Sequence, residues 1–294
     1  MDFLSTYLIL ASVYALVAIS TNLLIGVSGI FSVSQAAVFG VGAYTVGALT
    51  LNGIASYPVA LLVAICLSML VNVAFALPAL RVKGDYFVVA SFGIQLVASA
   101  IFENWNGVTG GTIGLLGIPM PEFLGFSARN TTDMLILTLA ALALASGLYL
   151  AMMRAAFGRL LLAIRENEEA VAAAGKSVVG TKVMAAGVAG AFAALAGGLY
   201  APFISFIDPH SFDLHTSILV IAMIAVGGMR TLSGSILGAF VLMGLPQLLT
   251  FVDIPSSLGG PLRQLMYGVL LVAFMMFRPQ GLAGRSFSET REGS

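Results

Sequence analysis

The sequence predicts an all-α, polytopic integral membrane helix bundle with about eight to ten membrane segments. Of its 294 residues, 59% are hydrophobic and only 9% are charged, and the mean hydropathy is +1.03. A soluble domain of this length cannot hide so much apolar surface in one core. Apolar runs of about 20 residues, enough to cross about 30 Å of hydrocarbon as a helix, also recur along the chain. We therefore treat residues 1–294 as a single transmembrane domain in contact with membrane lipid.

Eight of the apolar runs are ordinary candidates for membrane helices, at residues 4–25, 58–80, 86–102, 133–153, 183–206, 214–229, 232–250 and 262–277. A ninth, residues 29–49 (GIFSVSQAAVFGVGAYTVGAL), is rich in Gly, Ser and Ala. Small residues let helix backbones approach closely, and Gly-interrupted segments are tolerated where they line a cavity or pack inside a bundle. This segment is the best candidate to line a pore, and both a full crossing and a re-entrant passage stay open for it.

The basic residues predict the orientation of the chain. If the tail at residues 278–294 is cytoplasmic, eleven Lys and Arg residues lie inside and only Arg129 and Arg263 lie outside. The N-terminus is then outside, and no cleavable signal is evident before the first span. Two long connections result, an external loop at residues 103–132 and a cytoplasmic loop at residues 154–182. The lone Cys66 excludes an intramolecular disulfide and lies among apolar neighbours, as a membrane-buried thiol does.

The cytoplasmic loop contains AVAAAGKS, which matches part of a phosphate-binding loop. That motif needs a glycine where this chain has Ala170, and a strand before it. Residues 160–174 instead favour a helix, since they are rich in Ala, Leu, Arg and Glu. We therefore expect no nucleotide site in this chain.

The same loop predicts a short helix that docks on a partner. Acids cluster at Glu166, Glu168 and Glu169, small apolar residues follow, and Gly175 closes the segment. Acids in a first turn and a glycine past the last turn are helix-boundary signals. A short surface helix with an Ala/Val body suits the groove of another protein. The alternative is a solvated connector whose charges serve topology alone.

Glu169, Ala170 and Gly175 resemble the E-A-A-x-x-x-G coupling loop of ABC importer permeases, although Val171 replaces the second alanine and a later Leu-Pro is missing. The resemblance implies an ATPase-coupling role for a set of seven residues: Arg165, Glu166, Asn167, Glu168, Glu169, Ala170 and Gly175.

Residues 80–95, 104–119, 157–177, 189–201 and 277–282 resemble the permeases of branched-chain amino-acid ABC importers, and among these the M-type permease. This resemblance implies a multi-pass permease of the bacterial inner membrane with a cytoplasmic C-terminus. It also implies a second permease, two cytoplasmic ATPase subunits and a periplasmic substrate-binding protein as partners. ATP and Mg²⁺ would bind the ATPase subunits, with no cofactor in this chain and no nucleic-acid partner.

The interiors of the predicted spans contain no Asp, Glu, Lys, Arg or His. A transporter driven by an ion gradient normally places such groups in the membrane, so the driving force is expected from a separate ATPase. The uncharged polar side chains inside spans are Asn22, Ser32, Ser34, Gln35, Asn72, Gln95 and Ser99. Hydrogen bonding between helices is the usual role of such groups. Ser32, Ser34, Gln35 and Gln95 are the candidates for a substrate path, and Gln35 stands where the family often has histidine.

The stretch DPHSFDLH (residues 208–215) holds two His and two Asp but lacks the spacing of a metal site. We expect a turn and a helix start at the outer surface, with Asp213 near the helix N-terminus. No catalytic constellation is visible, so the chain is expected to be a transport subunit and not an enzyme. Urea, amides or aromatic acids are alternative substrates within the same importer class. An ATP-independent channel or facilitator is the alternative of a different class.

Overall fold

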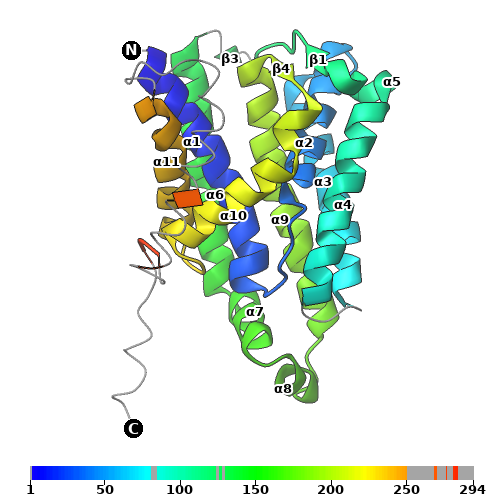
Figure 1. Cartoon of the computed structure of the whole chain (residues 1–294), viewed down its shortest axis with the longest axis vertical. Helices are drawn as coiled ribbons and strands as arrows, with labels where there is room; N and C mark the ends of the chain where they lie inside the picture. The colour runs from blue at the N-terminus through cyan, green and yellow to red at the C-terminus, as the bar shows by residue number, and fades with distance from the viewer. Residues whose placement is uncertain are drawn as a thin grey trace.

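The computed structural model describes residues 2–80, 85–123, 126–127, 130–249, 268–269, 276 and 281–283. These residues form a bundle of long helices that run between two ends of the molecule (Figure 1). Six of the described helices are long and apolar enough to cross a membrane, and two shorter apolar helices, α2 (Gln35–Leu51) and α11 (Leu232–Leu249), accompany them. The predicted class, a polytopic helical membrane protein, is confirmed. The predicted span at 262–277 lies outside the described residues, apart from 268–269 and 276.

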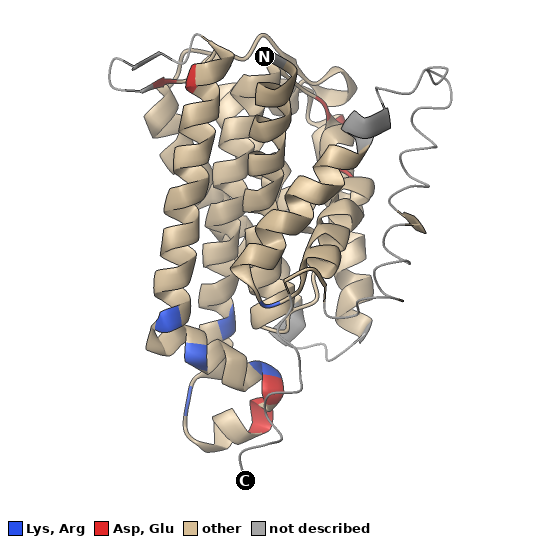
Figure 2. Ribbon diagram, turned by 90° about the vertical axis from the view of Figure 1, so that its left-hand side faces the viewer, with Lys and Arg blue, Asp and Glu red and all other residues tan. Residues whose placement is uncertain are grey.

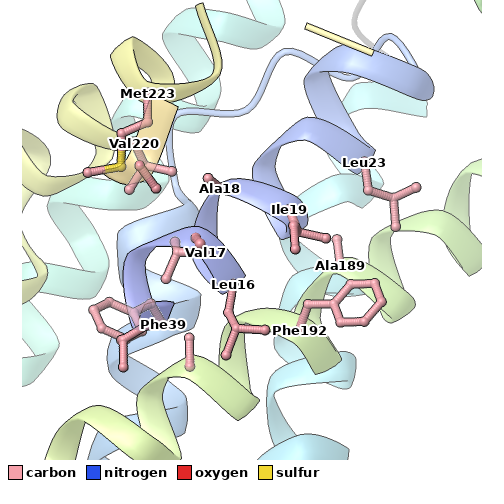
Figure 3. Packing of buried hydrophobic residues seen from close by; sticks show 14 of the residues in the cluster. Leu16, Val17, Ala18, Ile19, Leu23, Phe39, Ala189, Phe192, Val220 and Met223 are labelled. Carbon is pink, nitrogen blue, oxygen red and sulfur yellow. The ribbon is translucent and has the colours of Figure 1, made fainter. Parts of the chain in front are cut away.

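Helix α1 (Asp2–Thr21) is the most deeply buried of these six, and it continues as a π-helix, η1 (Asn22–Val27). Its Ala, Val, Leu and Ile side chains are apolar all round, so every face of the helix is suited to burial. Figure 3 shows Leu16, Ile19 and Leu23 of this segment packed beside Phe192 and Ala189 of α9. The core of the bundle is therefore built around the first span.

Helices α2 (Gln35–Leu51) and α9 (Val178–Ile204) approach each other so closely that glycine is required at the contact. A Cβ on Gly42 would lie 2.6 Å from the Cα of Ala194, and a Cβ on Gly197 would lie 2.4 Å from the carbonyl oxygen of Phe39. Helix α3 (Tyr57–Ala76) packs on both of them. Small residues thus serve the close packing of helix backbones, as is typical within membranes.

The Gly/Ser-rich segment passes from one end of the bundle to the other. Its first part, residues 28–34, is not helical, and α2 begins only at Gln35. Gly29 lies against Arg165 of α7 at one end, whereas Gly47 faces Leu115 and Ile207 near the opposite end. The segment therefore runs from one end of the bundle to the other, with a short non-helical start followed by a helix.

A second broken passage follows α9 and leads through β4 (Phe206–Ile207) and η4 (Pro209–Phe212) into α10 (Leu214–Gly227). The expectation of a turn at the outer surface is wrong for this stretch. Phe212 is fully buried and stacks edge-on against Phe39, with ring centroids 5.1 Å apart. Its carbonyl accepts a hydrogen bond from Gln95 in the middle of α4, so α10 starts inside the bundle. The expected capping by Asp213 is present, because its carboxylate accepts from the N–H of Thr216.

The remaining elements connect or flank these spans. Helix α6 packs on α1, α11 packs on α1 and α10, and the two-residue strands β1 and β4 pair antiparallel. The other described elements are η2 (Leu77–Leu80), α4 (Asp85–Asn104), α5 (Asn106–Thr109), η3 (Gly111–Ile113), β1 (Leu115–Leu116), β2 (Glu122–Phe123), β3 (Phe126–Ser127), α6 (Thr131–Arg154), α7 (Ala156–Glu166), α8 (Glu168–Ala173) and α11 (Leu232–Leu249).

Charged side chains divide the molecule into two ends. Among the described residues, Lys and Arg gather at the end that carries α7 and α8, as Figure 2 shows. The N-terminus of α1 lies at the opposite end, where the described acidic residues are not accompanied by basic ones. We call these the α8 end and the N-terminal end. This one-sided distribution is what the positive-inside rule produces in a membrane protein.

Candidate functional site

Helix α7 lies across the α8 end of the bundle and begins directly after α6. A Cβ on Gly158 would lie 2.5 Å from the Cα of Met153, so only glycine allows this tight corner. Leu161 and Ile164 are buried, whereas the residues between them are partly or fully exposed. The apolar side of α7 thus covers the ends of the membrane helices and leaves its polar side free.

The chain breaks at Asn167 and then forms the short helix α8. Asn167 adopts an extended backbone, and its side-chain oxygen accepts a hydrogen bond from the N–H of Ala170 at 2.9 Å. This is an N-cap, which stabilises a new helix start. The prediction of one helix over residues 160–174 is therefore wrong: two helices meet at Asn167. Because the chain is extended at Asn167, α8 does not continue the axis of α7.

Glycine ends α8 as the sequence predicts. Gly175 has a φ of +75°, in the left-handed region. The N–H of Lys176 bonds the carbonyl of Val171 at 3.3 Å, and the N–H of Gly175 bonds that of Ala172 at 2.9 Å. This pair of bonds is a Schellman motif, which satisfies the last carbonyls of a helix.

Helix α8 is the part of the described chain that projects farthest from the bundle at its end (Figure 1). None of its residues is buried, and Glu169 and Ala170 are exposed. One ion pair, 2.6 Å between the Nζ of Lys182 and a carboxylate oxygen of Glu168, ties α8 to the start of α9. The predicted coupling residues Glu168, Glu169, Ala170 and Gly175 thus share one exposed unit.

Arg165, at the end of α7, packs against the bundle, whereas the next residue, Glu166, is largely exposed beside it. The Cγ of Arg165 would lie 3.2 Å from a Cβ on Gly29, at the start of the broken segment. Burial lowers the pKa of the Arg165 guanidinium, and the nearby charge of Arg230 lowers it further, while Glu166 opposes the shift. A carboxylate oxygen of Glu166 lies 3.8 Å from a guanidinium nitrogen of Arg230, in the turn between α10 and α11.

A second cluster of polar residues lies inside the membrane part of the bundle, where the non-helical segment 28–34 needs hydrogen-bond partners. The hydroxyls of Ser32 and Ser34 lie 2.9 Å apart, and both residues are buried. The N–H of Val33 donates to the hydroxyl of Ser91 in α4 at 3.0 Å. Irregular backbone at membrane depth persists only where such partners or a cavity satisfy it.

Gln35 joins four helices in a buried network. Its side-chain oxygen accepts from the Ser20 hydroxyl of α1 at 3.0 Å, and its amide donates to Asn72 of α3 at 3.2 Å. The amide of Asn72 in turn donates to the α9 carbonyl of Ala186. The single hydroxyl proton of Ser20 is shared between Gln35 and the α9 carbonyl of Ala189, which lies 2.6 Å away. In the structure Gln35 thus acts as a link between helices.

Gln95 of α4 connects the start of α2 with the start of α10. We call α2 and α10 the half-helices, because each begins inside the bundle after a stretch that is not α-helical. Its side-chain oxygen accepts from the N–H of Ala37 at 3.1 Å and from the hydroxyl of Ser217 at 3.3 Å, and its amide donates to the carbonyl of Phe212 at 2.8 Å. The Ser217 hydroxyl also accepts from the N–H of Ala36 at 3.1 Å. Side chains of α4 and α10 therefore cap the first turn of α2. We call these five residues the half-helix junction.

The structure brings Ser32, Ser34, Gln35 and Gln95 into one region, around the start of α2. The sequence analysis did not identify Ser20, Ser91 and Ser217 as partners of these residues. A lone serine inside an apolar run carries no signal of its own, because its role depends on which distant helix it faces. No group of His, Cys, Asp and Glu among the described residues could hold a metal ion.

The described bundle, with its exposed α8 and its one-sided basic charge, is that of a membrane permease. The chain belongs to a family described as the branched-chain amino acid transport system / permease component, whose model matches residues 3–275.

Three relatives illustrate this membership. The chain is 29% identical to the high-affinity branched-chain amino acid transport system permease protein LivM of Escherichia coli, over 93% of this chain and 68% of that protein. It is 26% identical to the probable branched-chain amino acid transport permease protein LivM of Methanocaldococcus jannaschii, over 96% of this chain and 93% of that protein. It is 28% identical to the probable permease LivH of the same organism, over 68% of this chain and 64% of that protein. No solved structure gives a significant match.

Proposed function

We propose that this chain is the permease subunit of an ATP-driven ABC importer that moves branched-chain, hydrophobic amino acids across the bacterial inner membrane by alternating access. The observation that carries the proposal is α8, a separately capped, exposed helix at the basic end of the bundle. A helix that projects in this way suits the groove of a soluble partner. Glu168, Glu169, Ala170 and Gly175 would form the contact with the ATPase subunits.

The types of the buried side chains support the proposal that a separate subunit supplies the energy for transport. No Asp, Glu, Lys, Arg or His is among the buried residues of the described chain. Coupling to a proton or ion gradient normally uses ionisable groups within the membrane. ATP hydrolysis in a separate subunit, with ATP and Mg²⁺ bound there, fits this absence of buried charged groups from the described part of the chain.

The basic α8 end would face the cytoplasm, because short cytoplasmic loops are enriched in Lys and Arg. The N-terminus would then lie outside and the C-terminal tail inside. Two ATPase subunits would bind at the α8 end, and a periplasmic substrate-binding protein would deliver the substrate at the N-terminal end. The similarity to both LivM and LivH relatives supports a second, homologous permease as the partner within the membrane.

The substrate path would run past Ser32, Ser34, Gln35 and Gln95. These uncharged hydrogen-bonding groups lie beside apolar side chains of the core, such as Phe39. A zwitterionic amino acid with an aliphatic tail needs brief polar contacts and otherwise apolar walls. Weak contacts also suit a path, because tight binding would slow release.

A gentle affinity purification of the chain from its native membranes tests the proposal. We expect a second permease and ATPase subunits to co-purify, with measurable ATP hydrolysis. If the chain purifies alone and still moves solutes into vesicles without ATP, it is a facilitator and the proposal is wrong.

A further inference from the structure

The end of α7 contacts both broken passages of the bundle at the α8 end. Arg165 packs its aliphatic stem on Gly29, which has a φ of +72° and leads into the non-helical segment before α2. One guanidinium nitrogen of Arg165, Nη1, is buried and has no hydrogen-bond partner in the described structure. Packing of the aliphatic stem on Gly29 therefore holds this arginine in place. Burial of its guanidinium nitrogen without a partner costs free energy, because the charged group loses water.

Glu166, the next residue, reaches the turn after α10. Its carboxylate lies 3.8 Å from the guanidinium of Arg230. The backbone N–H of Arg230 donates to the buried side chain of Asn22 at 2.9 Å, and the amide of Asn22 donates to the carbonyl of Thr231 at 3.0 Å. The turn is thereby fastened to η1, the segment that precedes Gly29.

Residues 282–283, from the C-terminal part of the chain, also hold this turn. The N–H groups of Leu282 and Ala283 donate to the carbonyls of Val226 and Gly227 at 2.9 Å each. These are the last carbonyls of α10, which would otherwise lack partners. The turn after α10 is thus held by hydrogen bonds to η1 and to residues 282–283, and we expect it to move as one body.

Both routes from α7 lead to the half-helix junction. Gly29 leads through residues 30–34 to the start of α2, and Arg230 leads through α10 back to Ser217 in its first turn. There the Ser217 hydroxyl accepts from Ala36 and donates to Gln95. Contacts therefore connect α7 to both α2 and α10, and these two helices are joined to each other in the interior of the bundle.

We infer that Arg165 and Glu166 are transmission residues, which pass the movement of α8 to α2 through Gly29 and to α10 through Arg230. This inference rests on the proposed function. It gives these two residues a different role from that of Glu168 to Gly175: they act within the permease, through their contacts with Gly29 and Arg230. They are positioning residues, since they touch no substrate.

The test is the number of leucine molecules moved per ATP hydrolysed, measured with the complete importer in proteoliposomes. Arg165→Ala removes the stem that packs on Gly29, whereas Arg165→Met keeps an apolar stem without the charge. We expect Arg165→Ala to lower leucine moved per ATP by about tenfold, while ATPase binding persists, because networks of this kind carry coupling of this order. Arg165→Met should keep the ratio within about twofold of the wild type.

The charge pair gives a second test, which also decides the matter if Arg165→Ala fails to assemble. Glu166→Arg should lower the ratio, and adding Arg230→Glu should restore it, since the reversed pair can form again. A wild-type ratio in Arg165→Ala, equal losses in Arg165→Ala and Arg165→Met, or no rescue by the double reversal would each overturn the inference. Leucine uptake that is independent of ATP in the wild type would overturn the proposed function, and this inference with it.

Discussion

The side-chain oxygen of Gln95 in α4 accepts a hydrogen bond from the backbone N–H of Ala37 at 3.1 Å, in the first turn of α2. The two residues are 58 positions apart. Gln95 also accepts a hydrogen bond from the hydroxyl of Ser217 and donates one to the carbonyl of Phe212, at the start of α10. One uncharged side chain thus satisfies backbone and hydroxyl groups at two helix starts. Any movement that separates α2 from α10 has to break or exchange these hydrogen bonds.

Gln95→Ala should therefore destabilise the permease and impair uptake. The change leaves the buried N–H of Ala37 and the carbonyl of Phe212 without these partners, which costs about 1–3 kcal/mol per group. We expect a lower thermal unfolding temperature and slower leucine uptake. Ser99→Ala is the matched control, because Ser99 accepts only a long bond of 3.5 Å from Gln95. Equal unfolding temperatures for the wild type and Gln95→Ala would contradict this account of the junction.

Glu169→Lys should uncouple ATP hydrolysis from uptake while the chain still inserts in the membrane. Glu169 is exposed in the first turn of α8, where a positive charge opposes the helix dipole and reverses the charge offered to a partner. We expect leucine uptake to fall by about tenfold or more with ATPase activity retained. Glu169→Gln, which removes the charge without reversing it, should have a smaller effect. Normal uptake by the Glu169→Lys variant would remove Glu169 from the coupling surface.

Gly175→Ala should disturb the end of α8. The left-handed conformation costs a residue with a Cβ about 1–2 kcal/mol, although open space surrounds Gly175. We expect uptake to decrease in Gly175→Ala and to be largely kept in Gly175→Asn, because asparagine tolerates this conformation. Uptake assays on both variants check the prediction. A Gly175→Asn variant as impaired as Gly175→Ala would show that the backbone conformation is not the reason for glycine here.

Gly197→Ala should lower stability through the contact between α2 and α9. An added Cβ would lie 2.4 Å from the Phe39 carbonyl oxygen, so the two helices must separate. Overpacking of this kind costs about 1–3 kcal/mol, which is measurable as a lower unfolding temperature in detergent. Gly147→Ala on α6 is the control, because no atom lies within 4 Å of its added Cβ. If both variants unfold at the same temperature as the wild type, the close contact is wrong.

Much of this fold could be predicted from the sequence because the apolar runs are long and the charges are one-sided. The special character of residues 29–49 also followed from its Gly, Ser and Ala content. The non-helical start of that segment could not be predicted, since its conformation depends on Ser91 and Ser217, which lie far along the chain. The split at Asn167 was missed because the Ala-rich composition favours helix on both sides of it. The inward direction of Arg165 depends on Gly29, which no local pattern connects to it.

The central claim is that this permease moves its substrate only when a partner hydrolyses ATP. The most direct measurement is the uptake of radiolabelled leucine by proteoliposomes that contain the complete importer and its binding protein, with ATP supplied or withheld at the α8 end. We predict accumulation of leucine with ATP and none above background without it. Leucine entry at the same rate without ATP would contradict the claim and identify the chain as a facilitator.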